Sequence, residues 1–203
     1  MGVWEKENEV TFRQVAQRIR VPAGMVLAPL LFISARPTLA SLAAGAFVAV
    51  IGLAIRAWAS GHLKKNQELT TSGPYAHTRN PLYLGSFLLG AGVGISGGSV
   101  WFVALFVAFY LVIYVPVMVA EADTMRELFS EEYELYSKQV PLFVPRFTPY
   151  GAHGSHSYAA QLKRSPWHAG KRFDVSLYLR HREYRAALGF IAVYLLLATK
   201  MFL

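Results

Sequence analysis

Long apolar stretches alternate with shorter polar ones along the chain, which predicts a bundle of helices. Five runs carry few or no charged residues, and they cover residues 21–35, 38–58, 81–98, 100–120 and 186–203. A helix needs about 20 residues to cross the hydrocarbon core of a bilayer. The first run is short and contains Pro22 and Pro29, so it can cross only with residues borrowed from the helix before it. We therefore expect an all-α, polytopic membrane bundle of about five transmembrane helices.

The third and fourth runs are joined by Ser96-Gly97-Gly98-Ser99, a turn that is short enough to require an antiparallel helical hairpin. Small residues recur in both the second and the third run. Small side chains let helix backbones approach closely in membranes. The sequence therefore predicts tight helix packing around these runs.

The remaining segments complete a four-part organisation. Residues 1–20 have helical spacing with a basic face, which indicates an amphipathic helix on the membrane surface or a cap on the first span. Residues 21–145 form the membrane core, which includes an amphipathic helix over 121–139 that leaves the membrane. Residues 146–185 are basic and polar, with one short helix near 175–185, and residues 186–203 are a last span in which Lys200 can snorkel.

Composition supports a membrane protein and indicates its orientation. Of the 203 residues, 54% are hydrophobic and only 16% charged, against about 25% charged in ordinary soluble domains. The net charge is +8, and the basic residues lie beside apolar runs, which favours anionic lipid head groups over nucleic acid as partners. They flank one set of run ends, while the other carries only Arg36 and Lys200. The positive-inside rule then places the N-terminus and the active-site loops in the cytoplasm.

The candidate chemistry lies in the polar stretch from Glu68 to Gly85. Gly73-Pro74 is a turn signal, and Asn80-Pro81 is typical of a helix start. Such a start offers free backbone N–H groups and the positive end of a helix dipole, and Arg79 adds a cation. We interpret this stretch as a site for an anionic group at the cytoplasmic surface of the membrane.

Glu121 lies at the end of the fourth run, which the hairpin brings to the boundary where Arg79 lies. One reading is an Arg79–Glu121 ion pair that pins the hairpin. The other is a pocket for a zwitterionic cofactor, with Arg79 for its carboxylate and Glu121 for its amine or hydroxyls. Tyr75 and Tyr83 either hold a sulfonium or quaternary cation by cation–π contact or anchor the chain at the membrane interface.

Two motifs carry a family resemblance. The first reads Gly73-Pro74-Tyr75-x-x-x-Arg79-Asn80-Pro81-x-Tyr83-x-Gly85, and the second reads Glu121-x-x-x-Met125-x-x-x-Phe129-Ser130-x-x-Tyr133-x-x-Tyr136-x-x-x-Val140-Pro141. Together they resemble the signature of the isoprenylcysteine carboxyl methyltransferases and the related phospholipid methyltransferases. The resemblance implies an integral-membrane methyltransferase with a cytoplasmic cofactor pocket. It implies S-adenosylmethionine as methyl donor, S-adenosylhomocysteine as product, and an amphiphilic or lipid acceptor that enters from the bilayer.

The resemblance also implies the site residues. The catalytic residues would be Arg79, Asn80 and Glu121, with no metal. A carboxylate acceptor needs no general base, whereas an amine acceptor must lose a proton, which Glu121 or Asp123 could receive. The residues expected to bind the cofactor are Gln67, Leu69, Thr70, Gly73, Tyr75, Arg79, Asn80, Pro81, Tyr83 and Glu121.

This chain departs from the family pattern at five of its positions. Those positions are Gln67 and Asn80, where His is frequent, Ala122, where a second Glu is usual, Ser130, where Gly is usual, and Gln139, where a basic residue is frequent. These differences weaken the case for a prenylcysteine carboxylate as acceptor. The candidate acceptors are a prenylated cysteine carboxylate, a phospholipid amine, or another amphiphile with a thiol, hydroxyl or carboxylate.

Two other functions remain open. Membrane sterol-type reductases share a similar arrangement and use NADPH, whose 2′-phosphate would find Lys64 and Lys65 near the loop. A non-enzymatic lipid-binding membrane protein would use the basic tail instead. A di-iron oxygenase is disfavoured because the six histidines are scattered. A soluble dinucleotide-binding fold is also disfavoured, because no predicted strand is followed by a G-x-G-x-x-G turn.

Overall fold

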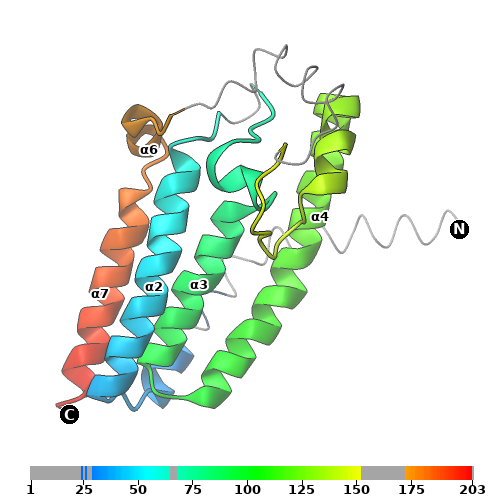
Figure 1. Ribbon diagram of the computed structural model, residues 1–203. Coiled ribbons are helices and arrows are strands. Elements are labelled where there is room, and N and C mark those ends of the chain that lie inside the picture. Colours follow the sequence, from blue (N-terminus) through cyan, green and yellow to red (C-terminus); the bar gives the residue numbers. More distant parts are fainter. Residues whose placement is uncertain (1–23, 25, 27–28, 65–67, 152–171, 203) are drawn as a thin grey trace, which may run out of the picture. The chain divides into compact units, whose positions relative to one another are not determined.

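The computed structural model describes residues 24, 26, 29–64, 68–151 and 172–202, and all regular structure among them is helical (Figure 1). The predicted all-α class is therefore confirmed for this part of the chain. Residues 29–34 form a short helix, and the predicted helix over 1–20 lies outside the described residues. The other helices are α2 (Leu39–Ser60), the 3-10 turn η1 (Gly73–Ala76), α3 (Pro81–Ser96), α4 (Val100–Gln139), α6 (Val175–Arg180) and α7 (Tyr184–Lys200).

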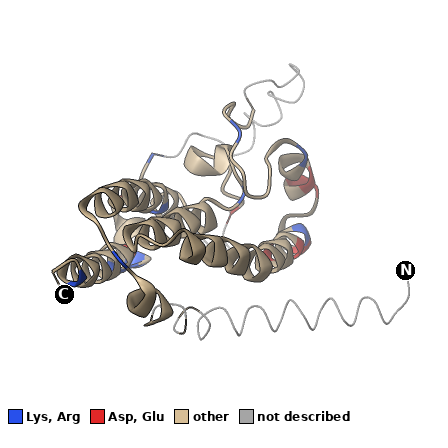
Figure 2. Cartoon of the chain, turned by 90° about the horizontal axis from the view of Figure 1, so that it is seen from below, with Lys and Arg blue, Asp and Glu red and all other residues tan. Residues whose placement is uncertain are grey.

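The helices have the composition of membrane helices. Helices α2 and α4 are long and apolar enough to cross a bilayer, and α3 is a shorter apolar helix. Figure 2 shows long stretches without Lys, Arg, Asp or Glu. Large apolar side chains such as Phe47, Leu39 and Trp101 are well exposed, as a lipid-facing surface requires. The number of spans, expected to be about five, stays a prediction.

The chain divides into two compact units. The first comprises Met1–Val50, Phe87–Asp123 and Gly189–Leu203, and the second comprises Ile51–Ser86 and Thr124–Leu188. Each unit is described by itself below.

In the first unit, the parts of α3 and α4 form the predicted antiparallel hairpin. A Cβ atom on Gly94 would lie 3.4 Å from Phe102, and one on Gly90 would lie 2.3 Å from Phe106. Residues farther before the turn on α3 therefore contact residues farther after it on α4, as in an antiparallel hairpin. Gly98 closes the turn with a φ of 72°, a left-handed conformation that favours glycine. A Cβ there would also lie 2.4 Å from the carbonyl oxygen of Arg36.

Small residues bring α2 and α3 together in the first unit, as the sequence predicts. A Cβ on Gly92 would lie 2.6 Å from the carbonyl oxygen of Gly45 and 2.6 Å from the backbone nitrogen of Ala49. The two backbones therefore touch, which only glycine allows at this position.

Lys200 lies at the end of α7, where it contacts the short helix over 29–34. Its Nζ donates to the backbone oxygens of Phe32 and Ile33, the latter at 2.9 Å, at the end of the short helix over 29–34. A cation at a helix C-terminus is favourable because the last carbonyls lack intrahelical donors.

The second motif continues α4 instead of forming a separate helix. Helix α4 runs from Val100 to Gln139, so the amphipathic stretch predicted over 121–139 extends the fourth run. It is kinked at Ser130, whose φ of 38° and ψ of −115° are not helical. Glycine, the usual residue at this position of the motif that the chain resembles, would adopt this backbone without strain. Beyond Gln139 the helix ends, as Val140-Pro141 predicts.

Candidate functional site

The candidate site is built on the loop from Glu68 to Asn80 in the second unit. Leu69 and Tyr75 are buried, and η1 turns the chain with a hydrogen bond from Tyr75 N to Ser72 O at 3.2 Å. Gly73 has a φ of 59°, and a Cβ there would lie 2.7 Å from the His62 ring. The Gly-Pro-Tyr turn therefore requires glycine for both its backbone conformation and its packing.

The helix start predicted at Asn80-Pro81 is confirmed. Helix α3 begins at Pro81, and the Asn80 carbonyl accepts from Leu84 N at 3.0 Å. The Asn80 side chain reaches across the loop, because its Nδ2 donates to the carbonyl oxygen of Leu142 at 3.0 Å. This tertiary bond fixes the chain just before the first helical turn.

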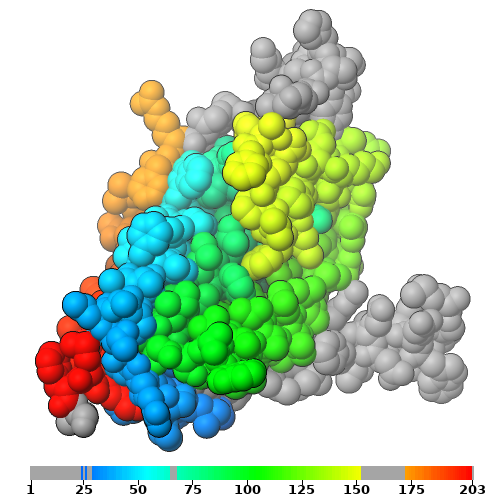
Figure 3. Space-filling view, turned by 60° about the horizontal axis from the view of Figure 1, so that its bottom comes forward, coloured from blue at the N-terminus to red at the C-terminus, as the bar shows by residue number. Residues whose placement is uncertain are grey.

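The segment 140–151 lies against the loop and bonds to it through backbone groups. Its last residues, yellow in Figure 3, lie on the surface of the molecule. The carbonyls and amides of this segment bond to the four consecutive loop residues 76–79, three through their backbone and Thr78 through its hydroxyl. The hydrogen bonds are Arg79 N to Pro141 O (3.0 Å), Thr78 Oγ1 to Phe143 O (2.9 Å), Arg146 N to His77 O (3.0 Å) and Tyr150 N to Ala76 O (2.9 Å).

Two tyrosines from the last turns of α4 hold the other side of the loop. The Tyr136 hydroxyl donates to Tyr75 O at 2.7 Å, and Arg79 Nη1 donates to the Tyr133 hydroxyl at 3.0 Å. Burial, with smaller effects from Tyr75 and Tyr133, raises the pKa of Tyr136 well above its ordinary value. Tyr136 therefore keeps its proton and remains a donor at neutral pH.

Arg79 has hydrogen-bonding capacity to spare. Its guanidinium lies over the Tyr133 ring, 5.8 Å from the centroid. Its Nε is buried without a hydrogen-bond partner, as is Thr70 Oγ1, and no other buried side-chain nitrogen or oxygen of the described residues lacks one. A buried polar group without a partner costs about 1–3 kcal/mol, so both atoms favour a ligand that would pair with them.

The structure gathers most of the predicted site residues within one unit. Glu121 and Asp123 belong to the first unit, so their pairing with Arg79 stays a prediction. Gln67 lies outside the described residues. The predicted residues of the second unit are Leu69, Thr70, Gly73, Tyr75, Arg79, Asn80, Pro81 and Tyr83.

Sequence reasoning missed several residues that support the loop. The aromatic stripe on α4 signalled packing, but not that Tyr133 and Tyr136 bond to the loop. The backbone carbonyls of Leu142 and Phe143 carry no sequence signal at all, since any residue supplies a carbonyl. His62, beneath Gly73, was also missed because its role depends on shape rather than on a motif.

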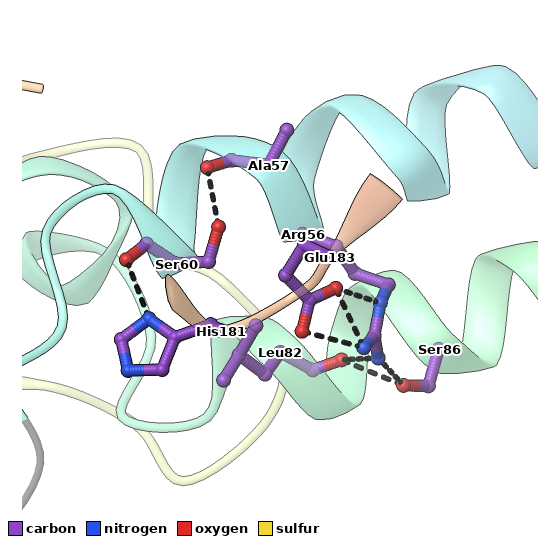
Figure 4. Close-up of polar contacts among 7 residues, drawn as sticks. All are labelled: Arg56, Ala57, Ser60, Leu82, Ser86, His181 and Glu183. Carbon is purple, nitrogen blue, oxygen red and sulfur yellow. Dashed lines mark hydrogen bonds and ion pairs between the residues drawn. The ribbon is translucent and has the colours of Figure 1, made fainter. Parts of the chain in front are cut away.

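Arg56 anchors the C-terminal part of the second unit (Figure 4). Its Nε and Nη2 donate to the Glu183 carboxylate at 2.8–3.0 Å, with both side chains mostly buried. Its Nη1 donates to Leu82 O at 3.4 Å and to Ser86 Oγ. Arg56 therefore joins α2 to α3 and to Glu183, the residue that precedes α7.

The described residues contain no group of three or more His, Cys, Asp or Glu side chains placed to hold a metal ion.

Comparison with known proteins supports the resemblance seen in the motifs. A family model described as phospholipid methyltransferase matches residues 38–132. The cobalt-zinc-cadmium resistance protein CzcN of Cupriavidus metallidurans is 30% identical over 74% of this chain and 75% of its own length. The nickel-cobalt-cadmium resistance protein NccN of Alcaligenes xylosoxydans xylosoxydans is 26% identical over 65% of this chain, which spans 63% of that relative. No solved structure shows a significant match.

Proposed function

The chain belongs to the phospholipid methyltransferase family, a family of membrane methyltransferases, and from this premise we propose that it transfers a methyl group from S-adenosylmethionine to a lipid or lipidated acceptor. The matched residues 38–132 include the loop from Glu68 to Asn80 and the first motif entirely. In the sequence, α2 precedes this loop and α4 follows it, and both helices are long and apolar enough to cross a membrane. The acceptor is a phospholipid amine or a prenylcysteine-like carboxylate.

The observation that carries the proposal is the unpaired Nε of Arg79. The Nε–H edge of an arginine is suited to a carboxylate, which S-adenosylmethionine presents at its amino-acid end. Tyr133 already occupies Nη1 and so fixes the orientation of the guanidinium. Arg79 therefore offers a charged, preorganised donor whose burial cost a carboxylate would offset.

The rest of the loop would contribute shape and polar contacts. Thr70 Oγ1 offers a second buried polar atom without a partner, and Gly73 gives the turn its left-handed backbone conformation. Tyr75 and Tyr83 would line the pocket, and Glu121 would complete it. The hydrogen bonds from segment 140–151 hold loop residues 76–79 in place within the second unit.

S-adenosylmethionine supplies an activated methyl group on a sulfonium. The protein therefore has to align the acceptor atom with that group and keep water out. With a carboxylate acceptor, no proton moves. With an amine acceptor, Glu121 or Asp123 would receive the proton, and both stand on the part of α4 that precedes the kink at Ser130.

Lipid contacts outside the site fit this function. Arg172, Arg180, Arg182 and Arg185 are exposed at or near α6, and they would bind anionic head groups if this end of the helices faces the cytoplasm. The proposal places the N-terminus and the loop on that side, following the distribution of basic residues.

An NADPH-dependent reductase is the main alternative, and one contact weighs against it. The Lys64 ammonium, a candidate for the 2′-phosphate, lies 3.7 Å from the Glu68 carboxylate, which is almost fully buried. A phosphate near Lys64 would therefore also lie near a carboxylate. This arrangement favours the methyltransferase.

The names of both relatives refer to metal resistance, and we extend the proposal to that process. A methylated membrane component would be this chain's contribution. Expression in a metal-sensitive host tests the extension: the wild type should raise tolerance to cobalt or cadmium, and Arg79→Ala should not. Equal tolerance with both proteins would separate any such role from methyl transfer.

Calorimetry on the detergent-purified protein tests the proposed function itself. We expect S-adenosylmethionine and S-adenosylhomocysteine to bind with dissociation constants of about 1–100 µM, equivalent to about 5–8 kcal/mol, and NADPH not to bind. Binding of NADPH alone would assign the chain to the reductases. Binding of none of the three would overturn both enzyme functions.

A further inference from the structure

The segment from Arg172 to Glu183, called the α6 segment here, binds the C-terminal end of α2 through hydrogen bonds and an ion pair within the second unit. Asp174 N donates to Gly61 O at 2.9 Å, and His181 Nδ1 lies 3.2 Å from Ser60 O. Glu183 closes the other end through its ion pair with Arg56 (Figure 4). Three separate attachments therefore fix a segment that lies outside the residues matched by the family model.

Phe173 is the side chain of this segment that contacts Gly61 and His62, the residues that follow α2. Its ring covers Gly61 so closely that a Cβ on Gly61 would lie 2.3 Å from it. The same ring meets the His62 ring edge-on, with centroids 6.3 Å apart.

His62 in turn contacts Gly73 in the candidate cofactor loop. It is buried, and its Nδ1 lies 2.9 Å from Trp58 O, which fixes the ring on α2's last turn. The opposite edge of the ring, Cδ2 and Nε2, faces Gly73, where a Cβ would lie 2.7–2.8 Å away. Phe173, His62 and Gly73 thus form a continuous row of contacts.

We propose that Phe173 is a positioning residue for S-adenosylmethionine binding, acting by holding His62 against the Gly73 turn. The proposal rests on the proposed function, because it assigns the loop to that cofactor. The C-terminal segment then sets the shape of the site without touching the ligand. Removing the ring should let His62 move and the turn relax, which weakens cofactor binding while leaving the chemistry of the bound state intact.

The first test compares Phe173→Ala with Phe173→Tyr. In Phe173→Ala, the dissociation constant and the KM for S-adenosylmethionine should rise about tenfold, with kcat at saturating cofactor nearly unchanged. Amide hydrogen exchange at Tyr75, His77 and Thr78, measured without cofactor, should accelerate. Phe173→Tyr keeps the ring and should behave as the wild type.

The control is Val175→Ala, which removes an exposed apolar side chain from the same segment. It should change neither the dissociation constant for S-adenosylmethionine nor the amide hydrogen exchange.

A second variant removes the same contact from the side of α2. Gly61→Ala places a Cβ where the Phe173 ring lies, and it should reproduce the effect of Phe173→Ala. Since both changes remove the same contact, the double variant should show no further loss.

Wild-type affinity and exchange in Phe173→Ala would overturn the proposal. So would a general rise in exchange across both units, since this would indicate a merely structural role. If the wild type binds no S-adenosylmethionine, the proposed function fails, and the exchange at residues 75–78 alone decides whether Phe173 positions the turn.

Discussion

The Tyr136 hydroxyl donates a 2.7 Å hydrogen bond to the backbone carbonyl of Tyr75, and both residues are buried. The last turns of α4 thereby hold the Gly73–Ala76 turn directly, although the two residues lie 61 positions apart in sequence. Because water cannot replace a buried partner, this bond makes the turn depend on the second motif.

Tyr136→Phe should therefore destabilise the second unit. The variant keeps the ring and leaves the Tyr75 carbonyl without its donor, which costs about 1–3 kcal/mol. Thermal unfolding in detergent should show a lower melting temperature, and the affinity for S-adenosylmethionine should fall with it. Tyr184→Phe, at a more exposed tyrosine, is the matched control and should melt as the wild type. An unchanged melting temperature in Tyr136→Phe would contradict this account of the turn.

The Arg56–Glu183 pair should show strong mutual dependence. Its two side chains are only 21% and 12% exposed, so either single change, Arg56→Gln or Glu183→Gln, leaves a poorly solvated charge. We expect each to lower the free energy of unfolding by about 2 kcal/mol and the double variant to cost less than the sum. Additive losses would mean that the two side chains act independently. Arg126→Gln, in an exposed pair with Glu134, should cost less than about 1 kcal/mol.

Ser130→Gly should stabilise the protein. The backbone of Ser130 has a φ of 38° and a ψ of −115°, a conformation that costs a residue with a side chain about 1–3 kcal/mol. Glycine adopts it without that strain, so the melting temperature should rise. Ser137→Gly, in regular helix, should instead lower stability by about 1 kcal/mol. A loss of stability in both variants would mean that α4 is not kinked at Ser130.

Two glycines of the first unit should respond in opposite directions to alanine. A Cβ on Gly92 would lie 2.6 Å from backbone atoms of Gly45 and Ala49, so Gly92→Ala must force α2 and α3 apart. Gly189, in α7, has no atom within 4 Å of its Cβ position, and Gly189→Ala should gain up to about 1 kcal/mol of helix propensity. Melting temperatures of the two variants check this. Equal effects would show that α2 and α3 do not touch at Gly92.

Helix ends and turns were predictable because each depends on a few adjacent residues of the sequence. Asn80-Pro81 marks the start of α3, Ser96-Gly97-Gly98-Ser99 marks the hairpin turn, and Val140-Pro141 marks the end of α4. The short helix predicted near 175–185 is also present, although it ends at Arg180 and the last helix already begins at Tyr184. Each of these signals acts through the conformation of a few adjacent residues.

The supports of the site were not predictable in the same way. Glu183 pairs with Arg56 across 127 positions, and the carbonyls of Leu142 and Phe143 bind the loop whatever their side chains are. The kink at Ser130 was not predicted, because a serine in place of the motif's usual glycine does not by itself reveal a backbone angle. The resemblance to the family therefore predicted the loop residues, whereas the residues that pack around them became apparent only from the structure.

The central claim is that Arg79 binds the carboxylate of S-adenosylmethionine, and calorimetry of one matched pair of variants tests it most directly. Arg79 and Arg126 both lie over the Tyr133 ring, at 5.8 and 5.9 Å from its centroid, so they share a neighbour and a charge. Arg79→Lys keeps the charge and removes the Nε–H edge, and we expect it to weaken binding at least about tenfold. Arg126→Lys should leave the dissociation constant within about twofold of the wild type. Wild-type affinity in Arg79→Lys, with the protein folded, would contradict the claim.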